Sequence, residues 1–136
     1  MLNPPARPVI WTPGLREHKA LAEKEAEFMR QPVGSGHFLL AAIWSRRTVL
    51  IHALPDLGVG PDVLAREVRR ELESRTDTSL TTIVHVAMAG ARGRGDPHVG
   101  IEHVLRATTR RRLGAAARAL ETLGLRESLA TWLAVV

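Results

Sequence analysis

The second half of this chain repeats the first, and this internal duplication constrains the fold more than any other feature. When each residue is set beside the residue 66 positions later, ten positions between 33 and 59 carry identical residues. Upstream, an offset of 65 aligns two alanines, so the second copy has one extra loop residue. A repeated unit of about 65 residues must be recognised before shorter motifs, because it sets the architecture. The identical pairs are Val33/Val99, Gly34/Gly100, His37/His103, Leu39/Leu105, Ala41/Ala107, Arg46/Arg112, Ala53/Ala119, Leu54/Leu120, Leu57/Leu123 and Gly58/Gly124, with Ala22/Ala87 and Ala26/Ala91 upstream.

The spacing of apolar residues within each unit is helical. Over residues 13–29, Leu15, Leu21, Ala22, Ala26 and Met29 recur mostly three, four or seven positions apart, which predicts an amphipathic helix. The helix is expected to be capped by the preceding Thr12, with Pro13 at its first position. Further helices are expected from about residue 35 to residue 45, over 48–54, and from 61 to about 74.

These patterns predict an all-α fold made of two tandem four-helix repeats. A unit of about 65 residues buries its apolar faces poorly by itself, so the two copies are expected to pack into one pseudo-twofold, eight-helix domain. The expected boundaries are a flexible N-terminal segment over 1–10 and a domain over 11–136. Within the domain, the first repeat covers about 11–75 and the second about 76–136.

Composition excludes several classes of function. The 136 residues include no cysteine, which removes disulfides, thiolate zinc sites and thiol nucleophiles. No apolar run is long enough to cross a bilayer, and the proline-rich start lacks the apolar core of a secretory signal. We therefore expect a cytoplasmic protein.

No enzymatic or cofactor motif stands out. The only glycine-rich run, 90–95, lacks the lysine of a phosphate-binding loop and a preceding strand, so the chain is not expected to hydrolyse ATP. Asp96, His98, Glu102 and His103 are near one another in sequence but lack the spacing of a metal site. The repeated histidines, His37 and His103, are expected to hydrogen-bond a neighbouring loop or helix end. We expect no enzyme activity, metal or cofactor.

A family resemblance rests on the duplicated elements. Val-Gly-Ser-Gly-His-Phe-Leu-Leu at 33–40 returns as Val-Gly-Ile-Glu-His-Val-Leu-Arg at 99–106, and each precedes Ala-Leu-x-x-Leu-Gly-Val/Leu, at 53–59 and 119–125. The chain thereby resembles the N-terminal repeat domain of Clp/Hsp100 unfoldases, particularly the ClpC type, whose two units each carry Gly-Thr-Glu-His-Leu/Ile-Leu-Leu. Trp11-Thr12 stands where that family usually begins with Phe-Thr. The resemblance extends from Trp11 to the C-terminus and implies a free-standing Clp N-domain without ATPase modules.

The resemblance implies a protein-binding function. In ClpC-type relatives this domain receives substrates and adaptors, and its signature turns bind phosphoarginine. The glutamate of each turn accepts the guanidinium, while a hydroxyl and helix N-terminal amides receive the phosphoryl group. Each turn here departs from the pattern: the first keeps a hydroxyl without the carboxylate, and the second keeps the carboxylate without the hydroxyl. The candidate ligand-binding residues are Gly34, Ser35 and Gly36 in the first turn and Gly100, Ile101 and Glu102 in the second.

The departures predict weak or lost phosphoarginine binding, with Glu102 and the amides near Gly100 as the better site. Losing a charged partner costs about 1.5–3 kcal/mol. Two simpler readings stand beside this one: Glu102 is an ordinary first-turn acid that complements the helix dipole, and Ser35 is an N-cap.

Candidate partner-binding residues are Trp11 and the run Arg110, Arg111 and Arg112. Trp44 and Trp132 are expected to be core or inter-repeat packing residues. The chain carries 19 Lys+Arg and 14 Asp+Glu, a net charge of +5. The arginine run either binds an acidic adaptor surface or is a solvated helix end that suits the dipole.

The main hypothesis is therefore a non-catalytic protein-binding module, acting as a stand-alone adaptor or a decoy in Clp-dependent proteolysis. Its expected partners are protein substrates, adaptors, Clp components and phosphoarginine-marked proteins. The alternative is an arginine-rich helical protein that binds polyanions or nucleic acid. Nucleic acid is the weaker choice, because the chain shows no helix-turn-helix signal and no aromatic residues interleaved with its basic ones.

Overall fold

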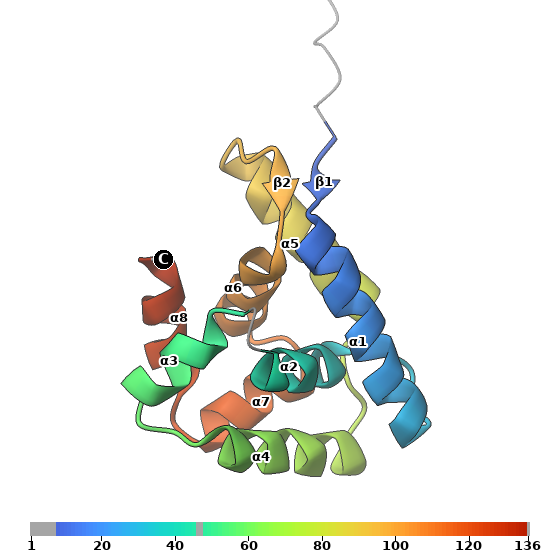
Figure 1. The fold of residues 1–136 in the computed structure, drawn as a ribbon, viewed down its shortest axis with the longest axis vertical. Helices are drawn as coiled ribbons and strands as arrows, with labels where there is room; N and C mark the ends of the chain where they lie inside the picture. Colours follow the sequence, from blue (N-terminus) through green and yellow to red (C-terminus); the bar gives the residue numbers. More distant parts are fainter. Residues whose placement is uncertain (1–7, 46–47, 136) are drawn as a thin grey trace, which may run out of the picture.

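The computed structural model describes residues 8–45 and 48–135, and this part of the chain is mostly helical, as predicted. Eight helices and one pair of very short strands make up the described fold (Figure 1). In chain order they are β1 (Ile10–Trp11), α1 (Pro13–Met29), α2 (Ser35–Trp44), α3 (Leu50–Asp56), α4 (Pro61–Ser74), α5 (Leu80–Gly93), β2 (His98–Val99), α6 (Ile101–Arg111), α7 (Gly114–Thr122) and α8 (Arg126–Ala134). None of the helices described is long and apolar enough to cross a membrane.

Helix α1 forms as its sequence predicts. The Thr12 hydroxyl accepts a hydrogen bond from the Leu15 amide at 3.1 Å, and Pro13 occupies the first helical position. The helix buries one stripe, Leu15, His18, Ala22 and Ala26, against α2.

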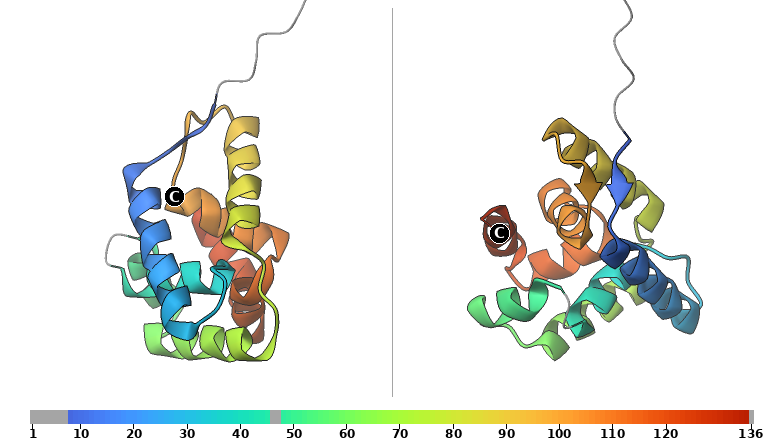
Figure 2. Two further views of the ribbon diagram at one scale, coloured as in Figure 1. Left: turned by 90° about the vertical axis from the view of Figure 1, so that its right-hand side faces the viewer. Right: turned by 45° about the horizontal axis from the view of Figure 1, so that its top comes forward.

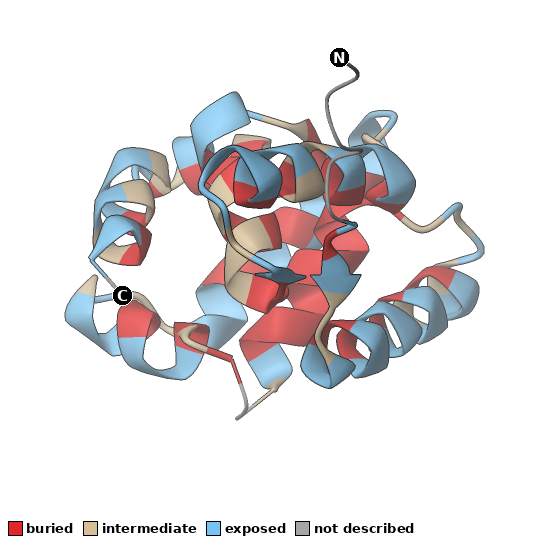
Figure 3. Ribbon diagram, turned by 90° about the horizontal axis from the view of Figure 1, so that it is seen from above, coloured by how far each residue is buried: buried red, intermediate tan, exposed pale blue. Residues whose placement is uncertain are grey.

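Helix α2 is the centre of the molecule. Every residue from Ser35 to Ile43 is buried, because the sequence offers almost no polar side chain that would require solvent. Helices α1, α4 and α7 pack around it. Figure 3 shows the same arrangement, with buried residues gathered inside and exposed residues on the outer surfaces of the helices.

The packing of the first half recurs in the second. Helix α1 packs on α2 and α5 on α6, while α2 contacts α4 and α6 contacts α8. Backbone bonds also cross between the halves: Thr12 N–H donates to the Val99 carbonyl at 3.0 Å, and Leu80 N–H donates to the Val33 carbonyl at 3.1 Å. Strands β1 and β2 pair in parallel beside the first of these bonds (Figure 2). The pseudo-twofold relation itself stays a prediction.

Some sequence expectations need correction. Val9 and Ile10, assigned to a flexible segment, belong to the packed part, because Val9 is buried and Ile10 pairs with His98. Residues 1–7, the rest of that segment, lie outside the described residues, as does Arg46 of the repeated pairs.

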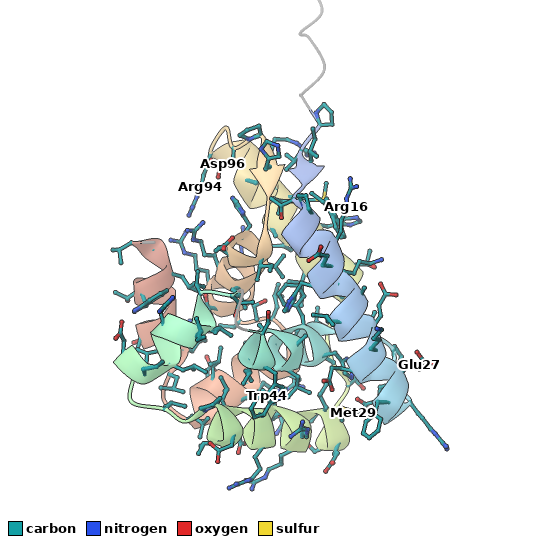
Figure 4. The ribbon with its side chains drawn as sticks, in the orientation of Figure 1. Arg16, Glu27, Met29, Trp44, Arg94 and Asp96 are labelled. Carbon is teal, nitrogen blue, oxygen red and sulfur yellow. The ribbon has the colours of Figure 1, made fainter. Side chains whose placement is uncertain are left out.

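The tryptophans differ in exposure, since Trp44 is exposed whereas Trp11 and Trp132 are partly buried. Trp44 is 52% exposed at the end of α2, so the expectation that it packs in the core is wrong (Figure 4). The Trp132 indole N–H in α8 donates to the Asp56 carboxylate of α3 at 3.0 Å, which confirms its inter-repeat contact.

Two buried histidines are held in the neutral form. His18 Nε2–H donates to the Phe38 carbonyl at 3.1 Å, and burial lowers the pKa of His18, against a weaker opposing effect of this bond. Burial also lowers the pKa of His37, although the charges of Asp77 and Glu25 oppose the shift. In the unfolded chain both rings take up protons near pH 6.5.

We expect acid to destabilise the fold through these rings. Because the folded pKa values lie below the unfolded ones, the contribution to stability is complete above about pH 6.5 and falls as the pH drops below that value. The melting temperature should be lower at about pH 5.5 than at about pH 7.5. His18→Gln should reduce this difference, whereas His85→Gln, at an exposed position, should preserve it. Equal melting temperatures at the two pH values would contradict the expectation.

Candidate ligand and partner sites

The first signature turn, 34–37, lies at the start of α2. Gly34, not Ser35, is its N-cap, so the expectation for Ser35 as the cap is wrong. Gly34 N–H donates to His37 Nδ1 at 3.0 Å, and Ser35 N–H donates to the Thr78 carbonyl at 3.0 Å. The backbone of this turn therefore bonds partly to its own helix and partly to the segment before α5.

The Asp77 carboxylate fills the space in front of this turn. One oxygen, Oδ2, accepts from Gly36 N–H at 2.9 Å. The other, Oδ1, accepts from the Ser35 hydroxyl at 2.6 Å and from Ala115 N–H at 2.9 Å. Ala116 N–H in turn donates to the Ser35 hydroxyl at 3.1 Å. The N-terminal ends of α2 and α7 thus share one internal anion, which suits the positive ends of both helix dipoles.

Close packing reinforces this arrangement. A Cβ on Gly36 would lie 2.7 Å from a methyl carbon of Leu72, and one on Gly34 would overlap the Asp77 carboxylate. The polar groups that the sequence assigned to a ligand in the first turn, the Ser35 hydroxyl and the Gly36 amide, are therefore already engaged within the protein.

The second signature turn, 100–103, is built differently. Gly100 caps α6, and its N–H donates to His103 Nδ1 at 3.0 Å. A Cβ on Gly100 would lie 3.1 Å from Glu102 Oε2 and 3.5 Å from Thr12 Oγ1, so both side chains border the turn. Glu102 is half-buried, and no residue described by the structure forms a hydrogen bond or ion pair with its carboxylate. Ile101 is buried, and its aliphatic side chain carries no hydrogen-bonding group.

The repeated histidines have the structural role that the sequence predicted. Each accepts the N–H of its cap glycine through Nδ1. Each then places Nε2 against the loop before its turn, on Gln31 Oε1 at 3.0 Å for His37 and on Asp96 Oδ2 at 3.1 Å for His103. Within the described residues, no three His, Asp or Glu side chains are grouped so that they could hold a metal ion.

Comparison with known proteins found one relative. No family profile matches the chain. Over 121 residues it is 30% identical to the negative regulator of genetic competence ClpC/MecB of Bacillus subtilis (strain 168), a match that covers 81% of this chain. This is a Clp-related helical domain. The chain spans 15% of the length of that relative.

The Clp-related domain has a basic groove between α5 and α6. The groove has a volume of about 380 Å³ and a floor of small apolar residues that includes Ala87, Gly90 and Ala91. Arg94, Arg106, Arg110 and Arg111 line it as well. Arg94 lies in the loop after α5, above α6 (Figure 4).

The arginine run that the sequence singled out is split by the fold. Arg110 and Arg111 face the groove, whereas Arg112 closes α6 in the left-handed conformation and pairs with Glu121 at 3.4 Å. Trp11, the other candidate partner-binding residue, lies in β1 and is partly buried against the core. The structure therefore does not bring Trp11 and the whole run into one surface.

Sequence reasoning missed Asp77 and Arg94. Asp77 lies 65 positions after Thr12, so these two residues are equivalent when the repeat alignment is extended upstream. Each borders a signature turn, Asp77 the first and Thr12 the second. The charge of Arg94 is evident from the sequence, but its position beside Arg110 and Arg111 depends on the fold.

Proposed function

We propose that this domain is a non-catalytic protein-binding module that engages protein substrates, adaptors or Clp components in the cytoplasm. It would act as a stand-alone adaptor or as a decoy in Clp-dependent proteolysis. Two features support the proposal: the similarity to ClpC/MecB over most of the chain, and the recurrence of the His-capped turn at the start of α2 and α6. The two repeats of the domain are proposed to be 11–75 and 76–136.

We further propose that any remaining phosphoarginine binding takes place at the second turn alone. The single observation that carries this is the contrast between the turns: Asp77 fills the first, whereas Glu102 at the second has no partner among the described residues. Glu102 would accept the guanidinium through charge-assisted hydrogen bonds, and the first amides of α6 would receive the phosphoryl group. The Thr12 hydroxyl beside Gly100 would replace the hydroxyl that Ile101 lacks.

Isothermal titration with phosphoarginine tests this assignment. We expect weak binding that Glu102→Gln reduces about tenfold or more, because a hydrogen bond to a charged group is worth about 1.5–3 kcal/mol. Glu127→Gln is the matched control, since Glu127 is also an acid in the first turn of a helix, and it should leave the affinity unchanged.

The possible results distinguish failure of the phosphoarginine assignment from failure of the proposed protein-binding role. No heat at about 1 mM ligand, or equal affinity in both variants, would overturn the phosphoarginine assignment. The protein-binding role would then be tested with purified ClpC, and failure to bind ClpC, its adaptors or its substrates would overturn that as well.

A further inference from the structure

The arginine-lined groove between α5 and α6 is a second polar feature, which shares only His103 with the second signature turn. Four arginines line it, yet its floor is made of alanine, glycine and valine residues. His103 also lines the groove, and its Nε2 is hydrogen-bonded to the Asp96 carboxylate at 3.1 Å. A cationic rim over an apolar floor can recognise a ligand that is both anionic and partly apolar.

The charges on the rim are largely uncompensated. Arg106 is engaged, since its Nε–H donates to the Leu133 carbonyl at 3.0 Å. By contrast, Arg94, Arg110 and Arg111 are exposed and form no ion pair with any residue that the structure describes. Elsewhere on the same half of the chain, arginines such as Arg118 and Arg126 are paired with glutamates at 2.9 and 2.7 Å. The groove therefore brings together three cationic side chains that are available for an external partner.

We propose that this groove binds an acidic peptide segment of a partner protein, with carboxylates on Arg94, Arg110 and Arg111 and an aliphatic side chain on the alanine floor. A protein ligand fits better than a nucleic acid, because neither Phe nor Trp lines the groove among the described residues, and the one aromatic ring there, His103, is held by hydrogen bonds at both ring nitrogens. The volume of about 380 Å³ accommodates a few side chains. This inference does not depend on phosphoarginine binding, which is assigned to Glu102 and the first amides of α6, and Glu102 does not line the groove.

The test measures binding of a short labelled peptide, Glu-Glu-Leu-Asp-Glu-Leu, by fluorescence anisotropy. A matched peptide with Gln and Asn in place of the acids, and a short oligothymidylate, serve as comparison ligands. We expect the acidic peptide to bind, the amide peptide to bind at least about tenfold more weakly, and binding to weaken between about 50 and about 200 mM salt.

Two kinds of variant locate the site. Arg94→Glu combined with Arg110→Glu should reduce the affinity about tenfold or more. The control is Arg66→Glu combined with Arg69→Glu on the exposed side of α4, which changes the net charge equally and should have little effect. Gly90→Leu tests the floor without changing charge: no atom lies within 4 Å of a Cβ at Gly90, so the fold accepts the side chain, and we expect it to block the groove.

Three results would overturn the proposal. Equal loss in the α4 control would show attraction to net charge only, and unchanged binding in Gly90→Leu would place the peptide elsewhere. If the oligothymidylate binds as tightly and is lost in the same variants, the groove is a polyanion or nucleic-acid site instead.

Discussion

Replacing Asp77 with alanine should destabilise the protein strongly. We expect this substitution to cost more stability than the removal of any other carboxylate side chain. The carboxylate accepts hydrogen bonds from Ser35, Gly36, Ala115 and Thr78, and its removal leaves buried amides at the ends of α2 and α7 without partners. Hydrogen bonds to a charged group and buried unsatisfied donors each cost about 1–3 kcal/mol. We expect a loss of about 3 kcal/mol in the free energy of unfolding, or about 10 °C in melting temperature.

Thermal and urea unfolding measure this effect. Asp62→Ala removes an exposed acid from the first turn of α4, and we expect it to cost under about 1 kcal/mol. Inorganic phosphate should raise the melting temperature of Asp77→Ala more than that of the unsubstituted protein, because it can enter between the two vacated helix ends. The account fails if Asp77→Ala is no less stable than Asp62→Ala.

Gly114→Ala should have the second large effect. Gly114 has a φ of +74°, and a Cβ there would overlap the Ser35 hydroxyl and the Asp77 carboxylate. The substitution therefore combines backbone strain of about 1–2 kcal/mol with displacement of the groups that join α2 to α7. We expect a total loss of about 3 kcal/mol or more in the free energy of unfolding.

Gly124→Ala is the matched control for this substitution. Gly124 has nearly the same φ, +70°, but no atom lies within 4 Å of a Cβ at that position. Gly124→Ala should therefore lower the free energy of unfolding by the backbone strain alone, about 1–2 kcal/mol. Equal losses in the two variants, measured by urea unfolding, would mean that contact with Ser35 and Asp77 contributes nothing.

The parts of this structure that could be predicted from sequence are those governed by local interactions. Helix α1 begins and ends where its apolar spacing, Thr12 and Pro13 predict. The capping role of His37 and His103 was also predictable in kind, since each histidine bonds to a glycine three residues earlier. Such features depend on a few neighbouring residues and need no knowledge of the fold.

The parts that could not be predicted depend on residues far apart in the chain. The Ser35 hydroxyl is used by Asp77, 42 residues away, and by Ala116, 81 residues away. Local preference favoured Ser35 as the cap, but a hydroxyl committed to a distant carboxylate cannot serve its own helix. Likewise, Arg94 joins Arg110 and Arg111 only because the loop after α5 returns along α6.

The crossed backbone bonds have a consequence for how the chain folds. Thr12 in the first half needs Val99, and Val33 needs Leu80 from the second half. The segments that precede the two signature turns therefore cannot complete their backbone hydrogen bonds until most of this chain has been synthesised. Although the sequence is duplicated, each half supplies hydrogen-bond partners to the other, so we expect the two halves to unfold together in one cooperative transition.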